Sequence, residues 1–341
     1  MDMERVQWGV IGSTGIAQKR TIPGFLLANN ADCVAIMSTK RENVDAVGER
    51  FGIDRRFTSV DELLAQTDID AVYIASPLYC HREQVIAAAK AGKHMLLEKP
   101  MGLTSEEAIE MNRACREHGV KLGVAFMMRF HGAHEQVKRI IQSGGIGEVV
   151  SAHAIFNTNS VVIPGKWRQI KALGGGGAVM DMGIHCIDLL QYLTGLRVET
   201  VSAICGNQIH QYPDVEDAST AVMKMSNGAI FSVASNFNIP YDAGGSSFAV
   251  YGTKGSVTAS RTLGQTETGT VYHISLEDGN REPVIVPFDD KNMYTKQIEA
   301  FSNAVLQDLP APVSAEDGIV DQQIVEAIYE SYEKGIHIHL R

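Results

Sequence analysis

Two side chains suited to proton transfer follow a run of four glycines. In the segment from Gly174 to Asp188, Asp181 and His185 are at positions i and i+4, which lie on the same face of a helix. A carboxylate beside an imidazole orients the ring and favours its protonated form, as a general acid or base requires. An ion pair in a surface helix is the alternative, but this segment is apolar on nearly every side. Asp181 and His185 are therefore candidate catalytic residues.

A third candidate stands in Glu98-Lys99-Pro100, directly after an apolar strand pattern. In an open α/β sheet, ligands bind at the carboxyl ends of the strands. A lysine placed there loses part of its hydration and exchanges its proton more readily. The alternative is an ordinary surface lysine, because lysine side chains are mostly exposed. Lys99 is therefore a candidate proton donor or acceptor, with the surface lysine as the more common case when the motif is taken alone. Glu98 is expected to lie at the cofactor site.

A glycine turn after the first predicted strand is typical of a dinucleotide site. Backbone N–H groups and the positive end of the following helix suit a pyrophosphate there. In the pattern G-x-G-x-x-G/A the key positions are Gly12, Thr14 and Ala17, so the second glycine is missing. An ordinary tight turn is the alternative, but a position one strand into a βαβ repeat favours the cofactor. The residues expected to bind it are Gly12, Ser13, Thr14, Gly15, Ile16 and Ala17.

The end of the second predicted strand indicates which dinucleotide is bound. NAD sites have an acid there for the ribose 2′-hydroxyl. This chain has Ser38-Thr39-Lys40-Arg41 instead, with two cations and no acid. Guanidinium and ammonium groups bind a 2′-phosphate, which a carboxylate would repel. NADP(H) is therefore preferred over NAD(H), the alternative being two solvated cations at a helix start.

Metal-dependent and serine hydrolase chemistry have weaker support in the sequence. Two histidine pairs, His131 with His134 and His337 with His339, lack a third ligand at a known metal spacing. The G-x-S-x-G turn of serine hydrolases is also missing. We expect no metal.

The first part of the chain alternates short strand patterns with longer helical ones. This alternation predicts right-handed βαβ units and a doubly wound parallel sheet, so we expect residues 1–126 to form an NADP(H)-binding Rossmann domain. The strands are expected at 8–11, 33–38, 71–75, 94–97 and 122–126, and the helices at 41–51, 81–92 and 105–119.

The rest of the chain, 127–341, is expected to form an α+β domain for substrate binding and oligomerisation. Long strands of period two at 219–225 and 229–237 are joined by Asn227-Gly228, a hairpin signal, and predict a large, mainly antiparallel open sheet. Helices are expected at 134–142, 294–306 and 318–334. One face of such a sheet stays uncovered by helices, which favours a homodimer or homotetramer.

Composition limits the class of partner. The chain has 341 residues, 45% of them hydrophobic, and a net charge of −10. An acidic surface does not suit nucleic acid or an anionic membrane, so the expected partner is a small molecule. Five cysteines without a C-x-x-C pair indicate thiols in a reducing compartment. No signal peptide or membrane span is recognisable, and we expect a cytoplasmic protein.

Taken together, the motifs resemble the glucose-fructose oxidoreductase/inositol dehydrogenase/MocA family over nearly the whole chain. The segments that carry the likeness are 12–17, 76–81, 91–94, 98–100 and 175–188. The resemblance implies that Lys99, Asp181 and His185 form the catalytic set at the nicotinamide. It also implies that Ser76, Pro77, Leu78 and His81 line the nicotinamide site, and that Arg129, Trp167 and Arg168 contact substrate. Leu78 departs from the asparagine that is usual after that proline.

The expected activity is hydride transfer between NADP(H) and a carbonyl or hydroxyl carbon of a sugar or polyol. One alternative is a nicotinamide-dependent glycosidase of the same family, which would retain NAD(H) tightly. The other is a dinucleotide sensor without catalysis, which the presence of Lys99, Asp181 and His185 disfavours.

Overall fold

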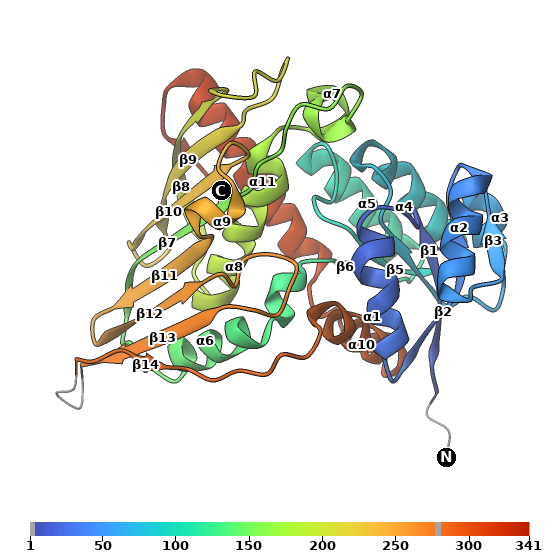
Figure 1. Ribbon diagram of the computed structural model, residues 1–341, viewed down its shortest axis with the longest axis horizontal. Coiled ribbons are helices and arrows are strands. Elements are labelled where there is room, and N and C mark those ends of the chain that lie inside the picture. The colour runs from blue at the N-terminus through green and yellow to red at the C-terminus, as the bar shows by residue number, and fades with distance from the viewer. Residues whose placement is uncertain (1–3, 277–280, 341) are drawn as a thin grey trace. The chain divides into compact units, whose positions relative to one another are not determined.

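A computed structural model describes residues 4–276 and 281–340. The chain divides into two compact units, one of residues 1–127 with 292–320 and the other of residues 128–291 with 321–341. Each unit is built on one sheet, as Figure 1 shows. The first sheet is parallel and the second is mostly antiparallel, which confirms the predicted α/β fold class.

The sheet of the first unit has the order β3-β2-β1-β4-β5-β6, with every neighbouring pair parallel. Its apolar strands are buried on both faces, as parallel strands between helices must be. The order reverses between β1 and β4, and ligands bind at such a switch point. The strands are β1 Val6–Ile11, β2 Ala31–Met37, β3 Arg55–Phe57, β4 Ala71–Ile74, β5 His94–Leu97 and β6 Leu122–Val124.

Local sequence signals set the ends of the helices in this unit. Thr104 Oγ1 accepts the N–H of Glu107 at 3.3 Å at the start of α5. Gly52 ends α2 in a left-handed conformation, with φ of 69°. The helical elements are η1 Ala17–Thr21, α1 Ile22–Leu27, α2 Arg41–Phe51, α3 Val60–Leu64, η2 Leu78–Cys80, α4 His81–Lys90 and α5 Ser105–Glu117.

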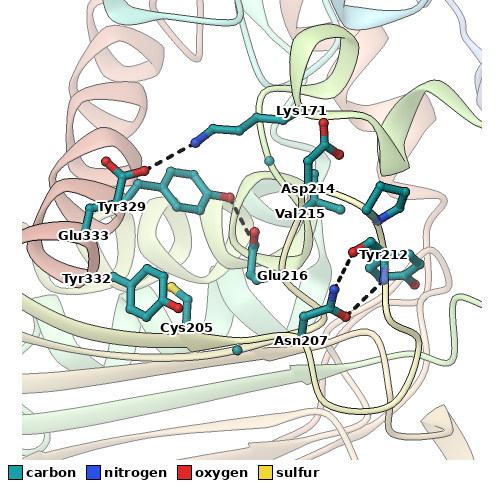
Figure 2. A pocket seen from close by; sticks show the side chains of 13 residues that line it. Lys171, Cys205, Asn207, Tyr212, Asp214, Val215, Glu216, Tyr329, Tyr332 and Glu333 are labelled. Atoms are coloured by element: carbon teal, nitrogen blue, oxygen red, sulfur yellow. Dashed lines mark hydrogen bonds and ion pairs between the residues drawn. The ribbon is translucent and has the colours of Figure 1, made fainter.

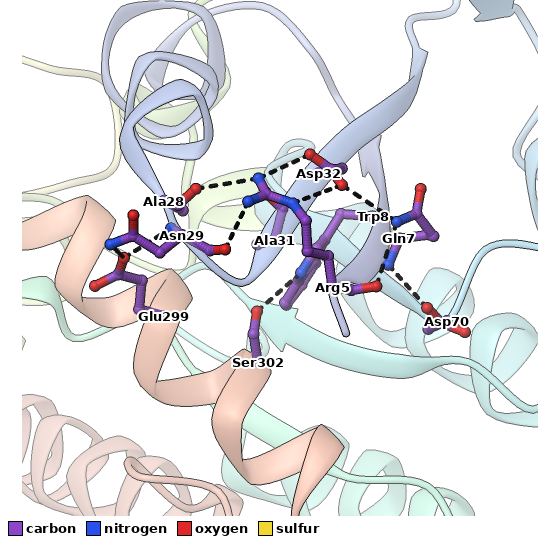
Figure 3. Close-up of polar contacts among 10 residues, drawn as sticks. All are labelled: Arg5, Gln7, Trp8, Ala28, Asn29, Ala31, Asp32, Asp70, Glu299 and Ser302. Atoms are coloured by element: carbon purple, nitrogen blue, oxygen red, sulfur yellow. Dashed lines mark hydrogen bonds and ion pairs between the residues drawn. The ribbon is translucent and has the colours of Figure 1, made fainter. Parts of the chain in front are cut away.

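Helix α10, Met293–Leu306, packs against β1 in this first unit. Trp8 Nε1 donates to Ser302 Oγ at 3.1 Å, and the Trp8 ring lies 5.5 Å from the Phe301 ring. Asn29 donates to Glu299 at 2.8 Å through its main-chain N–H and also through its side-chain amide (Figure 3). A segment that comes after most strands of the second sheet in the sequence therefore contributes to the core of the first unit.

Figure 3 also shows Arg5 at the amino end of the first sheet. Its guanidinium donates to both carboxylate oxygens of Asp32 at 2.8 Å and to the carbonyl oxygens of Ala28 and Ala31. These bonds hold the entry to β1 beside β2, opposite the end where ligands are expected.

The sheet of the second unit has the order β14-β13-β12-β11-β7-β10-β9-β8-β15. Among the described strands of this sheet, only β7 and β10 pair in parallel. The strands are β7 Val149–Asn157, β8 Val198–Gly206, β9 Ala218–Met225, β10 Ile230–Asn236, β11 Ser247–Gly252, β12 Gly255–Ser260, β13 Thr270–Ser275, β14 Val284–Ile285 and β15 Ile338–His339.

Side chains alternate across this sheet. Ala221, Met223 and Met225 of β9 are buried, whereas Val222 and Lys224 between them are exposed. The helical elements of this part of the chain are η3 Met127–Phe130, α6 Gly132–Gln142, η4 Trp167–Gln169, α7 Lys171–Gly174, η5 Val179–Gly183, α8 Ile184–Thr194, α9 Tyr241–Gly244 and α11 Ala315–Lys334. Among residues 4–276 and 281–340, no helix is long and apolar enough to cross a membrane.

Candidate active site

The glycine turn is held between the ends of β2 and β4. Gly12 has φ of +82°, and a Cβ atom there would lie 2.6 Å from the backbone nitrogen of Ser76. The N–H groups of Gly12 and Ser13 donate to Met37 O at 3.1 and 2.9 Å. Ala17 is fully buried where the next helix begins. Only glycine fits the first position of the turn, as a close approach of backbones requires.

The cations predicted to bind a 2′-phosphate lie at the carboxyl end of β2. Ser38 is buried, whereas Thr39, Lys40 and Arg41 are exposed. Arg41 Nε lies 3.1 Å from Asp45 Oδ2, one helical turn further along α2. Both cations are at the surface, and Arg41 forms an ion pair with Asp45.

His81 joins the segments that follow β4 and β5. Its Nε2 atom lies 3.0 Å from Ser76 O, and its Nδ1 atom lies 3.1 Å from the carbonyl oxygens of both Pro100 and Met101. The ring is only 2% exposed. Leu78 is buried beside it in the chain, after Pro77 at the start of η2, and the Ser76 hydroxyl donates to Gln84. Both ring nitrogens thus contact the backbone, so His81 holds this loop together.

Glu98 and Lys99 follow β5 at the carboxyl edge of the sheet. The Glu98 N–H donates to Ile74 O at 2.9 Å, and Glu98 Oε1 accepts the Tyr73 hydroxyl at 2.5 Å. Burial, together with the charge of Glu98, raises the pKa of Tyr73 well above its usual value. The Lys99–Pro100 peptide bond is cis. Lys99 is therefore at the end of the sheet where α/β folds bind ligands.

Asp181 and His185 lie on consecutive helical elements of the second unit. Asp181 is in the π-helical turn η5, which continues into α8, where His185 lies. Turns of this kind are frequent at functional sites. His185 is 5% exposed, with its ring 6.3 Å from the ring of Phe156. Asp181 is more accessible than His185, because about a third of its side chain is exposed.

The predicted substrate residues are distributed differently within this unit. Arg168 Nε lies 3.7 Å from Asp181 Oδ1, and the guanidinium carbon is 4.2 Å from the centre of the Trp167 ring. Arg129 instead donates to the buried carboxylate of Asp188, from Nε at 2.9 Å. The structure therefore brings Arg168 to Asp181 and to the Trp167 ring, while the guanidinium of Arg129 is paired with Asp188.

Glu216 and Tyr329 were missed by the sequence reasoning. The Glu216 carboxylate accepts N–H groups at the start of η5 and the Tyr329 hydroxyl. The one local signal is the run of four glycines, which indicates that something approaches the backbone closely. No spacing rule connects the glycine run with Glu216 and Tyr329, which follow it in the sequence by about 40 and about 150 positions. In the described part of the chain, no three His, Cys, Asp or Glu side chains form a group that could hold a metal ion.

Comparison with known proteins places both halves of the chain. Residues 6–126 match the oxidoreductase family with an NAD-binding Rossmann fold, and residues 134–258 match the GFO/IDH/MocA C-terminal domain. The chain belongs to the GFO/IDH/MocA oxidoreductase family. This confirms the resemblance seen in the motifs, and it identifies residues 6–126 as an NAD-binding Rossmann fold.

The two relatives named here cover more than nine-tenths of the chain. The 1,5-anhydro-D-fructose reductase of Ensifer adhaerens is 33% identical and covers 92% of each sequence. D-xylose 1-dehydrogenase (NADP(+)) 2 of Haloferax volcanii is 30% identical over 98% of this chain and 100% of the relative. The crystal structure of aldose-aldose oxidoreductase from Caulobacter crescentus has a TM-score of 0.92 and 25% identity, covering 99% of this chain and 100% of the other. The chain is thus an oxidoreductase of this family.

Proposed function

We propose that this protein transfers a hydride between NADP(H) and a carbonyl or hydroxyl carbon of a sugar or polyol, in the manner of 1,5-anhydro-D-fructose reductase. The observation that carries the proposal is the approach of Arg168 to Asp181. It places a side chain that can donate hydrogen bonds to sugar hydroxyl groups beside one of the two candidate acid–base residues, Asp181 and His185. The reductase from Ensifer adhaerens, 33% identical, supports the choice of substrate class.

The residues of the first unit fit a dinucleotide. A Cβ atom at Gly12 would collide with the backbone of Ser76, whereas nothing lies within 4 Å of a Cβ atom placed at Gly15, so the turn has open space for a ligand at Gly15. The cofactor is held by residues 12–17, 38–41, 76–78, 98 and 99. The buried His81 acts through the loop that it holds together. A bound nicotinamide supplies or accepts the hydride at C4.

Proton transfer belongs to the chain's own side chains. In the reducing direction, negative charge develops on the carbonyl oxygen of the sugar. Lys99 and His185 stabilise that oxygen, and one of them protonates it. Asp181 orients Lys99 and His185. Arg168 and Trp167 bind the sugar, whereas the guanidinium of Arg129 is held by Asp188. In the oxidising direction, each proton moves the opposite way.

NADP(H) is the preferred cofactor in this proposal, with NAD(H) as the alternative. The exposed Lys40 and Arg41 at the end of β2 suit a 2′-phosphate, and no acid stands beside Ser38 and Thr39 to bind a ribose hydroxyl. The relative from Haloferax volcanii, whose name includes NADP(+), agrees with this choice.

The direct test is a titration of the purified protein with NADPH and with NADH, followed by absorbance assays against a panel of keto-sugars that includes 1,5-anhydro-D-fructose. We expect tighter binding of NADPH and its oxidation by at least one sugar. Binding without turnover in either direction would favour a sensor. Nicotinamide retained through purification, together with cleavage of aryl glycosides, would favour the glycosidase.

We also propose that the protein is a homodimer or homotetramer assembled through the outer face of the large sheet. That face exposes apolar side chains on several neighbouring strands, an arrangement typical of a subunit interface. These are Val222, which is 44% exposed, together with Ile204, Ile230, Tyr251 and Tyr272.

A further inference from the structure

One buried carboxylate receives the N–H groups that open the helix of Asp181. Glu216 Oε2 accepts the N–H of Gly177 at 3.0 Å, and Oε1 accepts the N–H of Val179 at 2.8 Å. Between these two, the N–H of Ala178 donates to the main-chain oxygen of Glu216 at 3.3 Å. A single residue thus satisfies three consecutive donors that a helix start leaves without partners.

Tyr329, from α11, supports this carboxylate on its other side. Its hydroxyl donates to Glu216 Oε1 at 3.0 Å, and Figure 2 shows the two side chains pointing toward each other beside a pocket. Burial, and then the charge of Glu216, raise the pKa of Tyr329 well above its ordinary value, so the hydroxyl keeps the proton that it donates. The carboxylate is therefore held between α11 and the start of η5.

The glycine run is what allows this close approach. A Cβ atom at Gly176 would lie 2.0 Å from the hydroxyl oxygen of Tyr329, and one at Gly177 would lie 1.9 Å from the main-chain oxygen of Glu216. Real Cβ atoms do not tolerate such distances, and the contact at Gly177 is with backbone that cannot rotate away. Two of the four glycines are thus required by the Glu216 and Tyr329 contacts.

Two hydrogen bonds, both made by Gly177, connect Glu216 to Asp181. Gly177 donates its N–H to Glu216 and accepts the N–H of Asp181 on its carbonyl oxygen at 3.1 Å. His185 follows Asp181 one turn later on the continuing helix. A negative charge at this helix start also interacts favourably with the helix dipole. Movement of the helix start would therefore move both acid–base side chains.

We infer that Glu216, supported by Tyr329, is a positioning residue that fixes the start of the Asp181 and His185 helix. The catalytic consequence rests on the proposed function, whereas the anchoring itself rests on the contacts of the second unit alone. Displacement of a catalytic group by about 1 Å can cost a hundredfold in rate. Loss of this anchor is therefore expected to lower kcat and to leave the affinity for the cofactor unchanged.

Glu216→Gln is the informative variant, because its side-chain amide keeps the size of the carboxylate but presents an NH₂ group to one of the backbone donors. Asp214→Asn is the matched control, since Asp214 lines the same pocket, is exposed and loses the same charge. The measurements are kcat and KM for the sugar reaction, the Kd for NADPH, and hydrogen exchange of the amides at residues 177–179. We expect Glu216→Gln to lower kcat at least about tenfold and to speed this exchange about tenfold or more, with the Kd for NADPH within about twofold. Asp214→Asn should match the wild type.

Unchanged kcat and unchanged exchange in Glu216→Gln would overturn the inference. If that variant does not fold, Tyr329→Phe removes one hydrogen bond and should still speed exchange at Val179, and wild-type exchange there would count against the anchor. If the wild-type protein turns over no sugar, the proposed function fails, but the exchange comparison still decides whether Glu216 holds the helix.

Discussion

Arg168 Nε lies 3.7 Å from Asp181 Oδ1, although the two residues belong to different helical elements of the second unit. The guanidinium also stacks over the Trp167 ring, and 42% of the Arg168 side chain remains exposed. A planar cation held in this way keeps N–H donors available for hydroxyl groups of a ligand. A predicted substrate residue and a predicted catalytic residue therefore share one surface.

Arg168→Ala should weaken sugar binding. Loss of a charge-assisted donor is expected to raise KM for the sugar about tenfold, and the Kd for NADPH should stay within about twofold. Steady-state kinetics and a fluorescence titration measure these two quantities. Lys171→Ala is the control, because that nearby cation pairs with Glu333. An unchanged KM in Arg168→Ala would remove the residue from the substrate site.

Lys99→Ala should reduce kcat by about a hundredfold or more, since proton transfer by a positioned group contributes that much. The affinity for NADP(H) should remain within a few-fold, because most of the predicted cofactor contacts lie elsewhere on the first unit. Stopped-flow measurement of nicotinamide absorbance separates turnover from binding. Lys90→Ala, at the exposed end of α4, should behave as wild type. Normal turnover in Lys99→Ala would exclude the lysine from the mechanism.

Replacement of both Lys40 and Arg41 by alanine should weaken the binding of NADPH and leave the binding of NADH unchanged. Two cations that bind a 2′-phosphate are expected to contribute roughly tenfold or more to affinity, so the Kd for NADPH should rise while that for NADH is unchanged. Arg50→Ala, which removes one cation at the other end of α2, is the control for a general loss of positive charge. Equal weakening of both nucleotides, or of neither, would contradict the preference for NADP(H).

The buried His134 predicts a pH dependence of stability. Burial, followed by the neighbouring His131, lowers the pKa of His134 to about 3 from an ordinary 6.5. Between these values the unfolded chain binds a proton that the folded chain does not, so stability falls as pH falls from 6.5 toward 3. The slope for one such proton is about 1.4 kcal/mol per pH unit.

His134→Gln keeps a donor for Met128 O but cannot titrate, so its urea midpoint should change less between pH 6.5 and 4.5 than that of the wild type. The exposed His118 of the first unit supplies the control variant His118→Gln, which should keep the wild-type slope. Parallel curves for wild type and His134→Gln would disprove the assignment.

Val222→Lys should dissociate the proposed oligomer. Val222 lies on the outer face of β9, where a lysine in every copy of the interface would bury unpaired charge. Sedimentation velocity should show a dimer or tetramer for the wild type and a shift toward monomer for the variant. Leu26→Lys adds the same charge at an exposed apolar position of α1 and should leave the assembly intact. A monomeric wild type would contradict the proposal.

Features determined by neighbouring residues were predictable from the sequence. Helix α2 spans Arg41–Phe51 as expected, because a glycine with positive φ ends it. The strand at 219–225 and the helix at 294–306 begin one residue earlier than predicted, at Ala218 and Met293. Apolar periodicity, turn residues and caps act over a few positions, so they indicate the type and place of each element.

Contacts between distant parts of the chain were decided only by the tertiary structure. No local pattern indicates that α10 packs against Trp8 some 290 positions earlier, or that β7 and β10 pair in parallel. The pairing of Arg129 with Asp188 and the approach of Glu216 to the glycine run are of the same kind. Each depends on burial and hydrogen bonding between segments that meet only after folding, and a periodicity within one segment does not specify its partner.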